Sequence, residues 1–212
     1  VVDVMRAGPS TGQPTKTSQQ DVMQAKWGSH GDYEVIALAP SSVQEMFDLA
    51  VEAFNLSETY RCPVFLMTDE IVGHLMERLA IPEPDKIHLV DRKRPAAPSP
   101  DYLPFRSSED LVPEMATFGE GYRFYATGLT HDETGHPQTD SPEEHTKLVQ
   151  RLCDKIRKNT KKLARFEEVF VDDADVCIVA YGSVARSALS AVVEGREKGS
   201  KVGLLRLVTL WP

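Results

Sequence analysis

The stretch that decides the fold is VCIVAYGSVARSALSAVVEGREKGSKVGLL, which occupies residues 176–205. It opens with an apolar run, Val176–Tyr181, that predicts a strand. Amphipathic residues 184–198 predict a helix that Gly199 ends, and a second strand is predicted to start near Lys201. A strand, a helix and a strand in this order form a parallel pair with a right-handed crossover. The stretch therefore predicts an α/β fold.

The first part of the chain repeats this alternation of strands and helices. Three further apolar runs predict buried strands, at residues 1–6, 35–39 and 63–69. One helix is predicted from residue 17 or 18 to Trp27, and another after Ser42, whose capping-box partner is Glu45. Short apolar strands between amphipathic helices indicate mostly parallel sheets with helices on both faces.

A proline-rich segment divides the chain. Prolines recur between residues 82 and 104, which is typical of an extended connector. Beyond it, residues 122–127 predict a strand, and Ser141 followed by a proline predicts a helix that runs to about Leu163. Because both ends of the chain are strand-like runs, we expect a fragment of a longer polypeptide with two incomplete domains. The expected bounds are 1–81 for the first domain, 82–119 for the connector and 120–212 for the second domain.

The composition narrows the function classes. Of 212 residues, 41% are hydrophobic and 26% are charged, and the formal net charge is -8. A nucleic-acid-binding protein more often carries a clustered basic face, so we expect no nucleic-acid partner. No apolar run can span a bilayer and no signal peptide opens the chain, so we expect a cytoplasmic protein without a membrane partner. Cys62, Cys153 and Cys177 are too few for an iron–sulfur cluster and lack zinc-site spacing, so we expect no metal in this chain.

The segment most informative about chemistry is RAGPSTGQPT, residues 6–15, which follows a predicted strand and precedes a predicted helix. In an open α/β sheet, ligands bind outside the carboxyl ends of the strands. Exposed amides and hydroxyls beside a helix N-terminus favour an anion. Arg6 adds a planar fork of donors that suits a carboxylate or a phosphate. The alternative is a tight turn in which Arg6 pairs with a neighbouring acid.

Several strings resemble the alpha subunit of 2-oxoacid:ferredoxin oxidoreductases, of the 2-oxoglutarate type. The strongest is RAGPSTGQPT itself, and the likeness covers nearly the whole chain. The other matching strings are residues 19–21, 28–32, 39–45, 60–64, 68–70 and 128–135, together with the terminal strand–helix–strand unit. The resemblance implies the second half of a domain that binds the pyrimidine ring of thiamine diphosphate, followed by the start of a transketolase C-terminal-like domain.

The resemblance also implies a reaction and a site. The family converts a 2-oxoacid and coenzyme A to an acyl-CoA and carbon dioxide, and passes electrons to ferredoxin. Arg6 and Thr15 match residues that contact the carboxylates of the 2-oxoacid, and Ser10 and Thr11 would line the same pocket. No catalytic residue is expected in this segment. Thiamine diphosphate and Mg²⁺ would be held with a beta subunit, the iron–sulfur clusters would lie in partner chains, and the chain would be active only in the full complex.

Five other groups of residues permit a functional interpretation. His30 and Asp32 can lie next to the site. The loop with His131, Asp132, Glu133 and His136 can bind a metal, although a solvated loop is the simpler interpretation and the resemblance assigns it none. Gly182 and Ser183 suit an anion site or a simple strand–helix turn, and Asp69 and Glu70 suit an acid–base pair or the charged start of a helix. The basic helix face at residues 155–165 suits a contact with ferredoxin or a subunit, or a solvated face.

Two other functions stay open. One is a component of another thiamine-dependent 2-oxoacid dehydrogenase, which would use lipoamide. The other is a non-catalytic α/β scaffold subunit.

Overall fold

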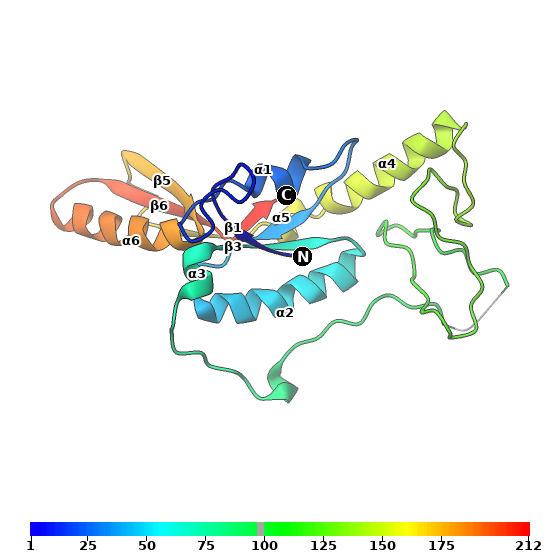
Figure 1. Ribbon diagram of the computed structural model, residues 1–212, viewed down its shortest axis with the longest axis horizontal. Helices are drawn as coiled ribbons and strands as arrows, with labels where there is room; N and C mark the ends of the chain where they lie inside the picture. Colours follow the sequence, from blue (N-terminus) through cyan, green and yellow to red (C-terminus); the bar gives the residue numbers. More distant parts are fainter. Residues whose placement is uncertain (97–99) are drawn as a thin grey trace.

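A computed structural model describes residues 1–96 and 100–212 of the chain. Pro98, one of the prolines of the predicted connector, lies outside the described residues. Two sheets form the body of the molecule (Figure 1). The first sheet has the order β1 (Val2–Met5), β3 (Val64–Asp69), β2 (Ile36–Leu38) and β7 (Thr209–Trp211), and the second has β4 (Phe166–Val169), β6 (Val202–Leu207) and β5 (Val176–Tyr181).

The strand pairing confirms the α/β class and adds two antiparallel contacts. In the first sheet β1 and β2 both run parallel to β3, and Met5 lies opposite Asp69 at the carboxyl ends of β1 and β3. In the second sheet β5 runs parallel to β6, as the strand–helix–strand pattern predicts. The antiparallel pairs are β2 with β7 and β4 with β6. The last strand of the chain therefore returns to the first sheet.

Helices cover both faces of the first sheet (Figure 1). On one face, Ile36 and Leu38 pack with Leu49 of α2 (Val43–Tyr60), and with Ile156 and Leu163. These last two residues belong to α4 (Pro142–Arg157) and α5 (Thr160–Leu163). On the other face, Met5, Ala37 and Met67 pack with Ala25 of α1 (Val22–Trp27). The alternation along each strand thus sends successive side chains to two separate cores.

The start of α2 differs slightly from the expected capping box. The Ser42 hydroxyl accepts a hydrogen bond from the Glu45 amide at 3.2 Å, as expected. The Glu45 carboxylate, however, accepts from the Ser41 amide at 2.7 Å. The same carboxylate also binds the Arg206 guanidinium of β6. Glu45 therefore caps α2 and ties the first sheet to the second.

Three predicted elements need correction. Residues 122–127 form no strand, because their aromatic rings pack in a local cluster: Tyr122 contacts Tyr102 at 5.1 Å between centroids, and Phe124 stacks on Phe118. The helix predicted from residue 17 or 18 begins only at Val22, because the side chains just before it bind the preceding loop. The long helix after Ser141 is interrupted after Arg157.

The second sheet carries α6 (Gly182–Glu197), which connects β5 to β6. The remaining short elements are α3 (Glu70–His74) and a 3-10 turn at Pro84–Lys86. Residues 105–140 are irregular apart from an isolated bridge between His131 and Pro137. In the part of the chain that the structure describes, every helix is too short or too polar to cross a membrane. The domain bounds at residues 81 and 119 stay predictions.

Candidate functional site

The loop at residues 6–15 begins where β1 ends, at the edge of the first sheet where β3 also ends. It is a closed turn: the Gln13 amide donates to the Ala7 carbonyl at 2.9 Å. Ser10 and Gly12 have positive φ angles of 56° and 54°. A Cβ at residue 12 would overlap the Ala7 carbonyl oxygen, so the turn requires glycine there.

The Arg6 side chain lies at the base of this loop and is partly buried. Its Nη1 donates to the Thr11 carbonyl at 2.7 Å. Within residues 1–96 and 100–212, no carboxylate forms an ion pair with it. The alternative interpretation, in which Arg6 pairs with a neighbouring acid, therefore does not describe this side chain. A guanidinium has five donors in a fork, so donors remain for a ligand carboxylate.

The other predicted site residues lie on the same loop. Ser10, Thr11 and Thr15 are exposed, so their hydroxyls can meet a ligand that approaches the carboxyl edge of the sheet. The loop amides differ from the expectation. The amides of Arg6, Gly8 and Gln13 all donate within the protein, so these three are not open to an anion. The substrate-binding roles of these four residues stay predictions.

His30 and Asp32 lie elsewhere. They are exposed in the connection from α1 to β2, which leads into the amino end of β2. The Arg6 loop follows the carboxyl end of β1, and β1 and β2 point the same way because both run parallel to β3. The structure therefore does not bring His30 or Asp32 to the Arg6 loop, and their role near the site stays a prediction.

The loop at residues 131–136 closes on itself. The Asp132 carboxylate accepts from the Thr134 amide at 2.9 Å and from Gln138 Nε2 at 2.9 Å. The hydrogen bond from the Thr134 hydroxyl, with that of Gln138, lowers the pKa of Asp132. Among the described residues, no cluster of three side chains suited to a metal ion is assembled. The acid of this loop therefore serves a turn.

Asp69 has a role that the sequence did not indicate. Its side chain is fully buried at the end of β3, and Oδ2 accepts from the Ser183 amide at the start of α6. Oδ1 accepts from Gln19 Nε2 at 2.9 Å, and the same Nε2 donates to the Tyr181 carbonyl at 3.1 Å. The anion at Gly182 and Ser183 is thus a carboxylate of this chain. Glu70 instead contacts His74 within α3 at 2.8 Å.

The predicted basic helix face is not continuous. Lys155 is buried, and its Nζ donates to the Arg61 carbonyl at 2.9 Å. Arg157 pairs with Glu34 at 2.7 Å, and Lys158 pairs with Asp154 at 3.0 Å. Most of these charges therefore serve contacts within the chain.

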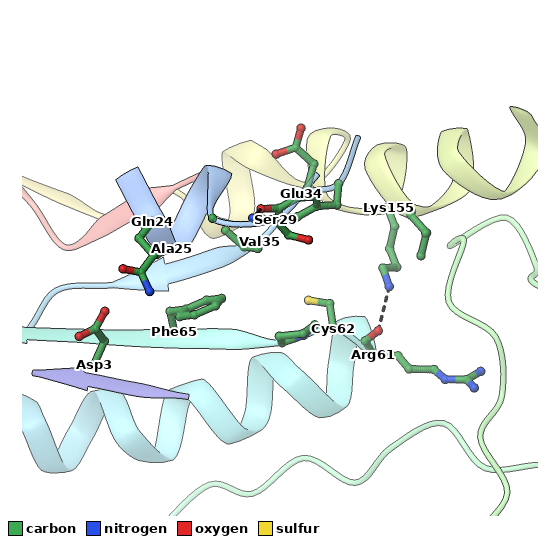
Figure 2. Close-up of a pocket in the computed structure, with 14 residues that line it drawn as sticks. Asp3, Gln24, Ala25, Ser29, Glu34, Val35, Arg61, Cys62, Phe65 and Lys155 are labelled. Atoms are coloured by element: carbon green, nitrogen blue, oxygen red, sulfur yellow. Dashed lines mark hydrogen bonds between the residues drawn. The ribbon is translucent and has the colours of Figure 1, made fainter. Parts of the chain in front are cut away.

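A cavity of about 470 Å³ lies beside the amino ends of β2 and β3 (Figure 2). Apolar groups including Ala25, Val35 and Phe65 line it, and Figure 2 shows Lys155 and Asp3 at opposite ends. Burial lowers the pKa of Lys155 to about 8. Burial and then the Asp21 charge raise the pKa of Asp3. This cavity is distinct from the Arg6 loop, and the sequence patterns did not indicate it.

The comparisons with known proteins agree with the strings quoted from the sequence. The model of the family "Pyruvate flavodoxin/ferredoxin oxidoreductase, thiamine diP-bdg" matches residues 1–151, and that of "Pyruvate:ferredoxin oxidoreductase core domain II" matches residues 174–212. The chain belongs to this family of pyruvate flavodoxin/ferredoxin oxidoreductases.

Particular relatives carry the likeness further. The chain is 52% identical over 212 residues to the 2-oxoglutarate synthase subunit KorA of Methanothermobacter thermautotrophicus, covering all of this chain and 56% of the relative. It is 54% identical over 213 residues to KorA of Methanocaldococcus jannaschii, with the same coverage. The chain is 38% identical over 214 residues to the ketoisovalerate oxidoreductase subunit VorB of M. thermautotrophicus, covering all of this chain and 52% of the relative. The chain thus spans about half the length of these relatives.

A solved structure is similar throughout the chain. It is the 2-oxoglutarate:ferredoxin oxidoreductase from Magnetococcus marinus with 2-oxoglutarate, coenzyme A and succinyl-CoA bound. The TM-score is 0.88 at 32% sequence identity, and the match covers 100% of this chain and 37% of that chain. The expected family and fold are therefore confirmed.

Proposed function

We propose that this chain is part of the alpha subunit of a 2-oxoglutarate:ferredoxin oxidoreductase. The assembled enzyme would convert 2-oxoglutarate and coenzyme A to succinyl-CoA and carbon dioxide, with electrons passed to ferredoxin. Relatives at 52% and 54% identity are 2-oxoglutarate synthase subunits, whereas the ketoisovalerate subunit stands at 38%, which favours the dicarboxylate substrate. The partners would be a beta subunit and ferredoxin, and the enzyme would be cytoplasmic.

The observation that carries the proposal is the state of Arg6. Its guanidinium lies at the carboxyl edge of the sheet, is held by the Thr11 carbonyl at 2.7 Å, and has no carboxylate partner among the described residues. A guanidinium that lacks an acid partner keeps donors that can bind an anionic ligand. Arg6 would grip a substrate carboxylate with two parallel hydrogen bonds, and Thr15 would contact a carboxylate through its hydroxyl. Ser10 and Thr11 would line the same pocket.

The residues present suit the substrate better than the metal-bound end of the cofactor. Mg²⁺ prefers oxygen ligands with one or two carboxylates, whereas the loop offers a guanidinium and hydroxyls. The diphosphate and Mg²⁺ would therefore be held with the beta subunit, and the iron–sulfur clusters by partner chains. Thiamine diphosphate supplies the ylid that attacks a keto carbon. The part of this chain would be to orient the 2-oxoacid so that its keto carbon faces that group.

The test is the substitution Arg6→Lys in the assembled enzyme. Lysine keeps the charge and loses the fork, so we expect the KM for 2-oxoglutarate to rise about tenfold, since a charge-assisted hydrogen bond contributes roughly 1.5–3 kcal/mol. The measurement is steady-state reduction of ferredoxin or a viologen dependent on coenzyme A. Arg106→Lys is the matched control, because Arg106 is exposed and pairs with Glu133 at 3.4 Å. An unchanged KM for Arg6→Lys removes Arg6 from the site.

The same assay separates the other candidate functions. Activity that depends on lipoamide in place of ferredoxin would identify another thiamine-dependent dehydrogenase. A complex that assembles without thiamine diphosphate and releases no carbon dioxide would identify a scaffold subunit. A preference for a branched-chain 2-oxoacid over 2-oxoglutarate would change the substrate and leave the reaction class intact.

A further inference from the structure

Three consecutive side chains immediately before α1 hold the Arg6 loop in place. They are Gln19, Gln20 and Asp21, which we call the clamp. We propose that the clamp is a set of positioning residues that fixes the Arg6 guanidinium relative to the second sheet without touching the substrate. This inference rests on the proposed carboxylate-binding role of Arg6.

Two members of the clamp hold the start of the loop. The Asp21 carboxylate accepts from the Arg6 amide at 2.9 Å through Oδ2. Gln20 Oε1 accepts from the Gly8 amide at 2.8 Å. Alternate amides at the end of β1 are therefore bound by side chains that follow the loop. The Gln13 amide also closes the turn onto the Ala7 carbonyl, so three amides of residues 6–13 are bound within the protein.

The third member connects the loop to the second sheet. Gln19 Nε2 donates to Asp69 Oδ1 at 2.9 Å and to the Tyr181 carbonyl at 3.1 Å. The other Asp69 oxygen accepts from the Ser183 amide. The end of β3, the end of β5 and the start of α6 therefore meet at one buried carboxylate. Gly182 belongs to this junction, because a Cβ there would overlap Asp69 Oδ2.

The arrangement explains how an exposed loop keeps a defined position. Residues 8–17 are exposed, so they contribute little apolar burial that could hold Arg6. Position is instead set by short hydrogen bonds to Asp21, Gln20 and, through Gln19, to the buried Asp69. Because the clamp contacts the loop and not the cofactor, loosening it should change substrate affinity more than kcat.

The experiment compares Asp21→Ala with Asp21→Asn in the assembled enzyme. Alanine removes the acceptor for the Arg6 amide, whereas asparagine keeps a side-chain oxygen there. We expect Asp21→Ala to raise the KM for 2-oxoglutarate about three- to tenfold, as the loss of one hydrogen bond implies, with a smaller change in kcat. Asp21→Asn recovers most of the KM. A merely structural role would lower kcat and the amount of folded enzyme in both variants and would leave KM alone.

A second readout needs no activity. The bond after Lys16 lies in the exposed loop, so trypsin cuts it faster when the loop loosens. Gln20→Ala, which removes only the contact with Gly8, keeps the test available if Asp21→Ala fails to fold. Gln44→Ala is the matched control: Gln44 also binds the backbone of a connecting segment, at Ala80, with distances of 2.9 and 3.1 Å. We expect faster cleavage after Lys16 in Asp21→Ala and Gln20→Ala, and the rate of the unaltered enzyme in Gln44→Ala.

The outcomes separate the clamp from the proposed function. If Arg6→Lys raises KM while Asp21→Ala and Gln20→Ala leave both KM and cleavage unchanged, the clamp is overturned and the proposed function stands. If the clamp variants speed cleavage after Lys16 but neither they nor Arg6→Lys change KM, the loop is held as described and does not serve the substrate. Equal effects of alanine and asparagine at residue 21 also overturn the clamp.

Discussion

The carboxyl and amino edges of the four-stranded sheet each contain a buried ionisable side chain, and the hydrogen-bond partners of these two side chains differ. At the carboxyl edge, Asp69 is fully buried and accepts hydrogen bonds from Gln19 and Ser183. At the amino edge, Lys155 is 2% exposed and donates to the Arg61 carbonyl, and no carboxylate of the described residues forms an ion pair with it. At the carboxyl edge, the hydrogen bonds of Asp69 join the two sheets. The amino edge borders a cavity of about 470 Å³. The hydrogen bonds that join the two sheets at Asp69 therefore lie at the edge where the Arg6 loop begins.

The largest effect should come from breaking the junction at the carboxyl edge with Gly182→Ala. Gly182 has a φ of +58°, and a Cβ there would overlap Asp69 Oδ2. The left-handed conformation costs about 1–2 kcal/mol for alanine, and displacing the carboxylate from the Ser183 amide adds roughly 1.5–3 kcal/mol. We expect the free energy of unfolding to fall by about 3–5 kcal/mol, measured by denaturant titration of the assembled enzyme.

Gly199→Ala is the matched control for that prediction. Gly199 has a φ of +87°, but nothing lies within 4 Å of a Cβ built there. The substitution therefore carries the backbone strain alone, about 1–2 kcal/mol. Equal losses for the two alanine variants would mean that Asp69 tolerates the methyl group, and that the junction at Asp69 does not require glycine at residue 182.

The next prediction concerns Lys155 at the amino edge. Burial lowers its pKa to about 8 from an ordinary value of 10.5. Between these two pH values the unfolded chain binds more protons than the folded chain, so this group makes the free energy of unfolding rise with pH. The rise corresponds to about 3 kcal/mol between pH 8 and pH 10.5. Below pH 8 the full cost of the buried charge is present.

Lys155→Met should remove this rise, because methionine has similar length and no charge. The measurement is the difference in unfolding free energy between the original and the substituted enzyme at several pH values from 7 to 10, which cancels the other titrating groups. Lys158→Met is the control, since Lys158 is exposed and pairs with Asp154 at 3.0 Å. A difference that stays constant over this range would show that Lys155 has the pKa of an ordinary lysine.

Many contacts at the two edges of the sheet join residues far apart in sequence, and local sequence patterns do not encode such contacts. The apolar runs correctly predicted the positions of β1, β2, β3, β5 and β6, and the amphipathic pattern predicted α6. The expected burial of residues 1–6 was wrong, because Val2 and Val4 of the edge strand β1 are exposed. The Ser42 cap was also found, since its hydrogen bond spans three residues. The segment at residues 6–15 was likewise placed correctly at the end of a strand. What the patterns identify is therefore the elements and the loop between them.

The partners of these elements were not predictable in the same way. Gln19 donates a hydrogen bond to Tyr181, which lies 162 residues away in sequence, and Ser183 donates one to Asp69, which lies 114 residues away. The pairing of β7 with β2 is equally distant, and β4 was missed because its sequence FEEV carries two acids and lies on an exposed edge. At residues 122–127 a strand was predicted where none forms, because aromatic residues with strand propensity can also pack in a local cluster.

The smallest expected effect compares one serine at each edge of the sheet. Ser42 lies after the carboxyl end of β2, and its hydroxyl accepts from the Glu45 amide at 3.2 Å. Ser29 lies before the amino end of β2 and lines the cavity. Ser42→Ala removes an N-cap and should lower the free energy of unfolding by about 1 kcal/mol. Ser29→Ala should change it by less than about 0.5 kcal/mol, as surface substitutions usually do. Denaturant titration of both variants side by side measures the difference. Because Glu45 also binds Arg206, a loss at Ser42 well above that of an ordinary cap would mean that the helix start and the contact between the sheets form one cooperative unit. Equal small losses at both serines would mean that the Glu45 carboxylate, which accepts from the Ser41 amide, is sufficient to cap α2.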